Sequence, residues 1–336
     1  MIDRENTRRT AGSFAACCGL LGAMGLLASK VSVENRFVVL LAGQTPVLLL
    51  VAMLGAVVAA VSRRWVAEAA CLVVCALGAW MLSPLYIASA DGAAPADPSG
   101  PSITIMQANI KIGQADPDAL VRTVQDRGVD ILTVQELTDE YIEALGTAGL
   151  DVLLPHRFVV SYGPGGEGSG IYSRFPLSNT RNLDGFQSAN LAADVDVGLR
   201  EPVALFAVHP APAYLFPAQQ WAADLRRLRG EFESDALRDN VIASGDFNAS
   251  YTQRQYRDLL TGGYSDAADQ VGAGLLPTMP ANRRLPAFIG IDRIITKGAA
   301  VTSLERIEIV DSDHHGLLAE VRLANSSTGQ TTPVAE

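Results

Sequence analysis

Two short polar segments in the second half of the chain carry residue types that suit phosphate chemistry. Gly245-Asp246-Phe247-Asn248 follows an apolar, strand-like run, and Ser312-Asp313-His314-His315 precedes another. Residues two apart on a strand share a face, so Asp246 and Asn248 should leave the end of a strand on the same side. Carboxylate, amide and imidazole groups placed in this way can bind a divalent cation and a phosphate at once. Either segment alone also occurs in ordinary turns and helix caps.

Further polar residues end or interrupt apolar runs elsewhere in the chain. They are found in Gln107-Ala108-Asn109, Gln135-Glu136, Tyr172-Ser173-Arg174-Phe175-Pro176-Leu177, Val208-His209-Pro210 and Ile291-Asp292-Arg293-Ile294. Sheet-based active sites collect their side chains at such strand ends. The sequence therefore predicts one site that is assembled from several strands.

In this order and spacing, the motifs resemble the endonuclease/exonuclease/phosphatase superfamily, which has the DNase I-like fold. The resemblance covers residues 103–323 and implies a four-layer α/β sandwich, with two mixed β-sheets flanked by helices. It also implies hydrolysis of phosphate esters or anhydrides with Mg²⁺, for which Mn²⁺ could substitute. The layout of the whole chain is similar to membrane-anchored bacterial members of the teicoplanin-resistance type, which are associated with undecaprenyl-pyrophosphate metabolism.

The resemblance assigns the metal and the water to four residues. Glu136 would be the main ligand of the metal, with Asn109 and Asp313 near it. Asp246 would orient and deprotonate the attacking water. Carboxylate and amide oxygens are suitable ligands for magnesium, which prefers oxygen. The alternative for Asn109 is a purely structural role at the end of a strand.

The resemblance assigns the phosphate to the remaining residues. Asn248 would hold a phosphate oxygen, and His209 would contact the phosphate or protonate the leaving group. Asp292 would fix the ring of His314, as carboxylates commonly do for histidine. Asp292 could instead be a salt-bridge partner, and His209 an ordinary loop residue. The role of His315 is left open, because neighbours on a strand point to opposite faces.

Helix and strand patterns alternate after residue 103, which is typical of an α/β fold with mixed sheets. Strands are expected at 103–108, 129–135, 158–161, 171–173, 191–197, 202–208, 241–244, 291–296, 307–310 and 317–323. Helices are expected after Asp116, at 139–145, at 217–234, and at 251–260 with Ser250 as the cap. The Gly-rich loop 163–170 is expected to connect a hairpin rather than to cradle a phosphate.

The first 88 residues predict a membrane domain with three transmembrane helices. The apolar segments 11–29, 37–62 and 66–87 are each long enough for a hydrocarbon core of ~30 Å. A soluble bundle would leave their outer faces uncovered. A linker (89–102) and a disordered tail (324–336) complete the predicted organisation, and cleavage after Ala90 is an alternative that would release the domain.

Basic residues are divided unevenly between the two sides of these segments. One side has Arg4, Arg8, Arg9, Arg63 and Arg64, and the other has only Lys30 and Arg36. The positive-inside rule then places the N-terminus in the cytoplasm and residues 103–323 outside the cell membrane.

The acidic charge of the domain and the short linker, which keeps the domain near the membrane surface, restrict the choice of substrate. Residues 101–336 carry nineteen Lys or Arg and thirty Asp or Glu, which disfavours nucleic acid as a partner. The leading hypothesis is a phosphohydrolase acting on a lipid-linked pyrophosphate at the outer membrane surface. The alternatives are an anchored extracellular nuclease, a sphingomyelinase-like phosphodiesterase, and a non-catalytic domain that binds lipid phosphates. The oligomeric state is left open.

Overall fold

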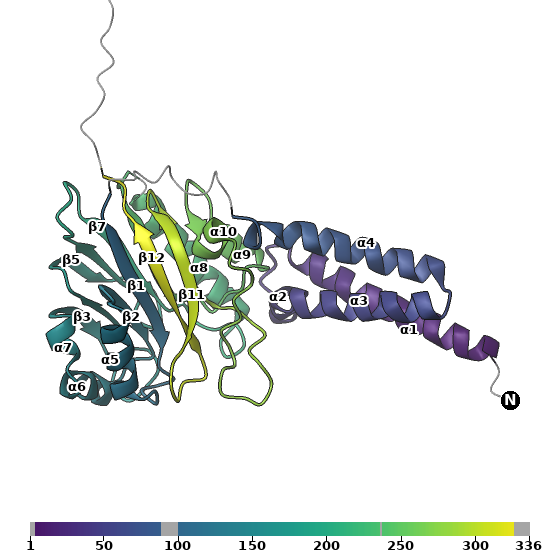
Figure 1. Cartoon of the computed structure of the whole chain (residues 1–336), viewed down its shortest axis with the longest axis horizontal. Coiled ribbons are helices and arrows are strands. Elements are labelled where there is room, and N and C mark those ends of the chain that lie inside the picture. The colour runs from purple at the N-terminus through teal and green to yellow at the C-terminus, as the bar shows by residue number, and fades with distance from the viewer. Residues whose placement is uncertain (1–3, 89–99, 236, 326–336) are drawn as a thin grey trace, which may run out of the picture.

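Helices fill the first part of the chain and two β-sheets dominate the second (Figure 1). The computed structural model describes residues 4–88, 100–235 and 237–325. Most of the predicted linker, the end of the predicted tail and the predicted cleavage position after Ala90 lie outside the described residues.

Three long helices lie side by side in a bundle: α1 (Arg4–Ala28), α3 (Thr45–Val61) and α4 (Trp65–Leu82), with α4 followed by the short helix η1 (Ser83–Leu85). By length and composition, α1 and the segment from α4 through η1 are able to cross a membrane. The short helix α2 (Arg36–Gly43) and α3 would add a third crossing as one bent span.

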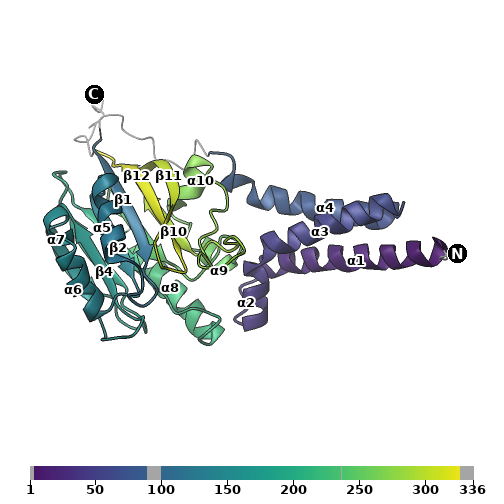
Figure 2. The same cartoon turned by 60° about the horizontal axis from the view of Figure 1, so that its bottom comes forward.

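The predicted helix over 37–62 is wrong in one respect, because it is broken. The axes of α2 and α3 differ by 66°, and α2 turns across the end of the bundle that faces the domain (Figure 2). Pro46 lies in the first turn of α3 and has no N–H, so the helical hydrogen bonds cannot continue through it. Gln44 ends α2 and begins α3, and its N–H donates to Leu40 and Leu41 carbonyls.

Two six-stranded sheets form the domain. The first has the order β11 (Ala300–Glu308), β12 (His315–Arg322), β1 (Ser102–Asn109), β2 (Ile131–Gln135), β4 (Ser169–Ser173), β3 (His156–Val160). The second has the order β5 (Leu177–Asn182), β6 (Leu191–Val195), β7 (Val203–Val208), β8 (Val241–Asp246), β10 (Asp292–Lys297), β9 (Ser265–Asp266). The pairs β1–β2 and β7–β8 are parallel and the other pairs are antiparallel, so both sheets are mixed.

The sheets pack face to face and carry helices on their outer sides, which confirms the four-layer sandwich. Buried residues such as Ile105, Leu205 and Ile242 form the core between the sheets. The helices α5 (Pro117–Asp126), α6 (Asp139–Thr147) and α7 (Leu150–Leu153) cover the first sheet. The long helix α8 (Ala218–Ser234) covers the second, and the short helices α9 (Arg254–Arg257) and α10 (Ala267–Val271) lie toward the bundle (Figure 1).

Local sequence signals explain some of these elements and miss others. Asp116 caps α5 as predicted, and its side chain accepts a hydrogen bond from the Ala119 N–H. The helix predicted over 251–260 with Ser250 as its cap is much shorter in the structure, because only α9 forms and Gln253 stands at its N-terminus. The edge strand β5 was not predicted, since it is mostly exposed and polar and lacks an apolar alternation.

Candidate active site

The predicted site residues come from strand ends that meet at one edge of the two sheets. The antiparallel pairing of β8 with β10 sets Asp246 directly beside Asp292. The parallel pairing of β1 with β2 sets Asn109 beside Gln135, so that Glu136 follows at the end of β2. Residue 314 immediately precedes β12, the strand that pairs with β1.

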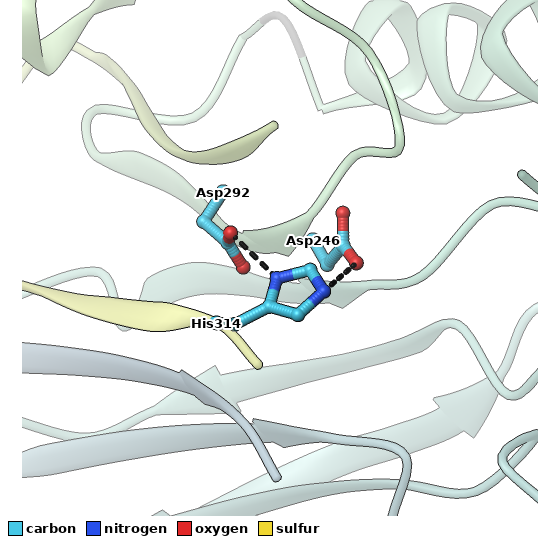
Figure 3. Close-up of side chains that lie close together, drawn as sticks. All are labelled: Asp246, Asp292 and His314. Carbon is cyan, nitrogen blue, oxygen red and sulfur yellow. Dashed lines mark hydrogen bonds and ion pairs between the residues drawn. The ribbon is translucent and has the colours of Figure 1, made fainter. Parts of the chain in front are cut away.

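The ring of His314 lies between the carboxylates of Asp246 and Asp292 (Figure 3). Its Nδ1 is 2.9 Å from Asp292 Oδ2, and its Nε2 is 3.9 Å from Asp246 Oδ2. All three side chains are buried. The predicted pairing of His314 with Asp292 is therefore present, and it leaves Nε2 facing the side of the site that holds Asp246.

Electrostatics favour a charged ring at this position. Burial disfavours the charged form, but the carboxylates of Asp292, Asp246 and Asp313 outweigh it and raise the pKa of His314 to about 10. Burial, followed by the charge of Asp292, raises the pKa of Asp246 to about 6. At neutral pH the site thus combines an imidazolium with carboxylates, and the ring can donate a hydrogen bond from Nε2.

Gln107 holds Asp292 from the opposite sheet. Its Nε2 donates to Asp292 Oδ1 at 2.7 Å and to Gln135 Oε1 at 2.8 Å. Gln107 stood in the predicted motif without a role. The sequence could have revealed this role through the spacing of Gln107 and Asn109. The two residues are two apart on one strand and so share a face, and Asn109 was already assigned to the site.

Asn109 connects the two carboxylates that would serve the metal and the water. Its Nδ2 donates to Glu136 Oε1 and to Asp246 Oδ2, both at 3.0 Å. Its Oδ1 accepts a hydrogen bond from the Lys111 N–H at 3.0 Å. In this arrangement Asn109 orients the carboxylates, and its ligation of a metal stays a prediction.

The donor groups around Glu136 fit a hard divalent cation. Burial raises the pKa of the Glu136 carboxyl, the hydrogen bond from the Asn109 amide and the charge of His314 lower it, and the negative charge of Asp313 raises it. Glu136 also has φ of +60°, a left-handed conformation that is uncommon for a non-glycine residue and is enriched at functional sites. A cation held by Glu136 and Asp313 would neutralise this partly buried pair of carboxyl groups.

A second group of possible ligand atoms lies beside it. One atom each from Asp246, Asp292 and His314 can be chosen so that all three lie within 4.8 Å of one another. A protonated imidazole has no lone pair for a metal, and the raised pKa of His314 favours that form. The oxygen groups of Glu136 and Asp313 therefore suit magnesium better than this trio does.

Asn248 and His209 border the site. The Asn248 N–H donates to Asp246 Oδ1 at 2.8 Å, and its side-chain amide donates to the Pro210 carbonyl at 2.9 Å. Burial lowers the pKa of His209, and its Nδ1 has no hydrogen-bond partner within the described residues. Asn190, which was not predicted, accepts a hydrogen bond from the His209 N–H at 2.7 Å.

Gly245 allows β8 to approach β7 at this edge. A Cβ atom at this position would lie 2.1 Å from the backbone oxygen of Val208. Because backbone cannot yield as a flexible side chain would, a larger residue would displace Asp246 or His209. The glycine of the predicted motif is thus a packing requirement.

The structure brings together all eight predicted residues. Asn109, Glu136, Asp246, Asp292 and His314 are linked by hydrogen bonds or ion pairs, and Asp313, Asn248 and His209 adjoin them. Their individual catalytic roles stay predictions.

Comparison with known proteins agrees with this geometry. Residues 106–314 match the sequence profile of the Endonuclease/Exonuclease/phosphatase family. No curated protein sequence matches the chain significantly.

Solved structures of similar fold come from distant relatives. An endonuclease/exonuclease/phosphatase from Beutenbergia cavernae DSM 12333 is 18% identical, with a TM-score of 0.52 over 66% of this chain and 72% of that one. TDP2 from D. rerio, complexed with single-strand DNA product, is 17% identical, with a TM-score of 0.54 over 66% of this chain and 99% of that one. At these identities the structures establish the fold alone. The family match spans more than half of the sequence, and the chain belongs to the endonuclease/exonuclease/phosphatase family.

Proposed function

We propose that the protein is a Mg²⁺-dependent phosphohydrolase that acts on a lipid-linked pyrophosphate at the outer surface of the cell membrane. The family hydrolyses phosphate esters, so the proposal concerns the metal, the substrate and the location. The observation that carries it is the direct packing of the catalytic domain on helices able to cross a membrane.

In the proposed reaction, water attacks the terminal phosphorus and the bond from this phosphorus to the bridging oxygen breaks, which releases inorganic phosphate and leaves the lipid monophosphate. Asp246 orients the water and accepts its proton, because Asn109 and the Asn248 N–H hold its two oxygens in place. A bound divalent cation supplies neutralisation of the phosphate charge. His314 donates from Nε2 to a phosphate oxygen, and Asp292 fixes the ring through Nδ1.

His209 and Asn248 complete the proposed phosphate contacts. Burial keeps His209 neutral, so it would serve as a hydrogen-bonding partner of the phosphate rather than as a charged group. Asn248 would need to turn its amide from the Pro210 carbonyl toward a phosphate oxygen.

The packing of the two parts supports a membrane-bound substrate. Val39, Leu82 and Leu85 of the helical region belong to the same buried cluster as Trp221 and Phe247 of the domain. Because Phe247 directly follows Asp246, the site is held close to the end of the bundle. The uneven distribution of basic residues supports an outward-facing domain.

A nuclease is the second candidate function. It is favoured by the fold that the chain shares with D. rerio TDP2, which was crystallised with a DNA product. The excess of acidic residues in residues 101–336 argues against it, since nucleic-acid affinity depends on neutralising phosphates with Lys and Arg.

A parallel substrate assay tests the proposal. Purified protein with Mg²⁺ or Mn²⁺ is given undecaprenyl pyrophosphate, plasmid DNA and sphingomyelin separately. Release of inorganic phosphate from the prenyl substrate, with intact DNA and sphingomyelin, is expected. Rapid cleavage of DNA with no phosphate release would replace the lipid proposal with the nuclease. Binding of the prenyl substrate without turnover would indicate a non-catalytic domain.

A further inference from the structure

The helix α2 exposes apolar side chains where the bundle meets the domain. Phe37 is 81% exposed and Leu40 is 39% exposed, although α2 is the first half of a bent apolar span. Figure 2 shows α2 across the end of the bundle rather than along it. In a membrane, a helix in this position lies near the interface, where exposed apolar side chains contact lipid.

A loop of the catalytic domain lies against the start of this helix. Arg36 Nη2 donates to the Phe216 carbonyl at 3.1 Å. In the same loop, Tyr214 is 49% exposed and Leu215 is 65% exposed. We name these four exposed apolar residues, Phe37, Leu40, Tyr214 and Leu215, the entry surface.

The loop also reaches the catalytic centre. It begins after His209-Pro210, and the N–H groups of Leu215 and Phe216 both donate to the Pro212 carbonyl, which closes a tight turn. Burial, and then the carboxylates of Asp246, Glu136 and Asp313, raise the pKa of Tyr214 to about 12. Tyr214 is thus within electrostatic reach of the catalytic carboxylates while part of its side chain is exposed.

The other end of α2 is fixed to the segment that follows Asn248. Thr252 Oγ1 donates to the Ala42 carbonyl at 2.7 Å, and Gln253 Nε2 donates to the Val39 carbonyl at 2.9 Å. The helix is therefore bonded at its start to the loop that follows His209 and further along to the segment that follows Asn248.

We propose that the entry surface contacts the bilayer and guides a long-chain lipid so that its phosphate group reaches the catalytic centre. The inference rests on the proposed function and extends it to a specificity for chain length. Continuity with the bent span is the reason to choose a membrane lipid as the occupant, because α2 and α3 together are apolar and long enough to cross a membrane. The apolar chain would lie against Leu215 and α2, and the phosphate would lie beyond Tyr214.

Chain-length preference tests this proposal. The kcat/KM values of undecaprenyl pyrophosphate in vesicles and of soluble geranyl pyrophosphate are compared in the wild type, in Leu215→Ser and in Val152→Ser. Val152 is 85% exposed in α7, on the side of the domain away from the bundle (Figure 1). Leu215→Ser should lower the long-to-short ratio about tenfold, since burying a leucine side chain has an effect of that order. Val152→Ser should leave the ratio unchanged.

Failure of this inference differs from failure of the proposed function. An unchanged ratio in Leu215→Ser overturns the entry surface, whereas a wild type that hydrolyses neither substrate overturns the proposed function.

A second measurement does not depend on activity. In lipid nanodiscs, a photoreactive benzoylphenylalanine at position 215 should crosslink to phospholipid, and the same group at position 152 should not. Absence of a lipid adduct at position 215 would refute the proposed contact.

Discussion

His314 lies buried between the carboxylates of Asp246 and Asp292, and the positive charge of its ring offsets their negative charge. Its pKa in the folded protein is about 10, above the ordinary value of 6.5. The charged ring therefore adds stability that is fully present below pH 6.5 and is lost as the pH rises through 10. The raised pKa of Asp246, about 6, acts in the same direction at lower pH, because stability falls as this buried carboxyl becomes charged between its ordinary pKa of 3.8 and pH 6.

The raised pKa of His314 predicts that the effect of His314→Gln on the melting temperature depends on pH. In EDTA, the melting temperature of the wild type should exceed that of the variant most at pH 6.5. The gap should narrow toward pH 10, because the wild-type ring loses its proton. A gap that stays constant over this range would show that His314 is not the titrating group.

Asp246→Asn should slow hydrolysis by roughly 10²–10⁴-fold, which is the range for loss of a positioned base. The new amide oxygen can still accept one of the two hydrogen bonds that Asn109 and the Asn248 N–H donate to Asp246, so the fold should be preserved. Membrane association should also be unchanged, because the substitution lies outside the apolar segments 11–87 that are expected to span the membrane. The rate of phosphate release from washed membranes measures hydrolysis, and the amount of protein retained in those membranes measures association. A variant with the wild-type rate would exclude Asp246 as the base.

Glu136→Gln keeps the shape of a proposed metal ligand and removes its charge. The Asn109 amide can still donate to the remaining oxygen. We expect a loss of Mg²⁺-dependent activity beyond the roughly 10–100-fold typical of outer-sphere partners. A titration of activity with Mg²⁺ measures it. Full activity of the wild type in excess EDTA would remove the metal from the mechanism.

The site residues differ in how far the sequence could predict them. Asp246 and Asp292 were found because each stands in a polar motif that ends or interrupts an apolar run. The role of Gln107 depends on a partner 185 positions away, in the other sheet. No local pattern specifies such a contact, although strand spacing placed Gln107 on the correct face.

Among the elements, strands were easier to predict than the broken span. Strands such as β7 and β8 are short apolar runs with clear ends, whereas α2 and α3 form one apolar stretch with a proline inside it. Pro46 was the signal for the break. The contacts that hold α2 across the bundle come from Thr252 and Gln253, more than 200 positions along the chain.

Gln253→Leu should destabilise the contact between α2 and the domain. The substitution removes the hydrogen bond to Val39 and leaves the buried Ser250 N–H without its acceptor, Gln253 Oε1. An unsatisfied buried group costs about 1–3 kcal/mol. The melting temperature should fall, while Gln255→Leu, where Nε2 has no partner within the described residues, should have little effect. Equal effects of the two changes would contradict the assigned contact.

For the whole molecule, the sequence predicted two parts and a linker but not their contact. The bundle and the domain share a buried cluster that joins Leu85 to Phe247. Arg226 of α8 also pairs with Glu34, just before α2. The position of the site relative to the bundle is therefore set by packing between the two parts as well as by the length of the predicted linker. This packing depends on side chains far apart in sequence, which periodicity does not reveal.

The orientation of this assembly in the membrane is a separate prediction. A reporter that fluoresces only in the cytoplasm, fused after Glu336, should stay dark because the basic residues place the domain outside. The same reporter fused before Met1 should be bright. A bright signal from the C-terminal fusion would reverse the proposed side.

The central claim is metal-dependent hydrolysis of a lipid pyrophosphate by the site around Asp246. Its most direct test is release of inorganic phosphate from undecaprenyl pyrophosphate in nanodiscs, measured for the wild type and Asp246→Asn with Mg²⁺ and with EDTA. The account predicts release only by the wild type with Mg²⁺, apart from a residual rate in the variant. Equal release by both proteins, or no release by the wild type, would contradict it.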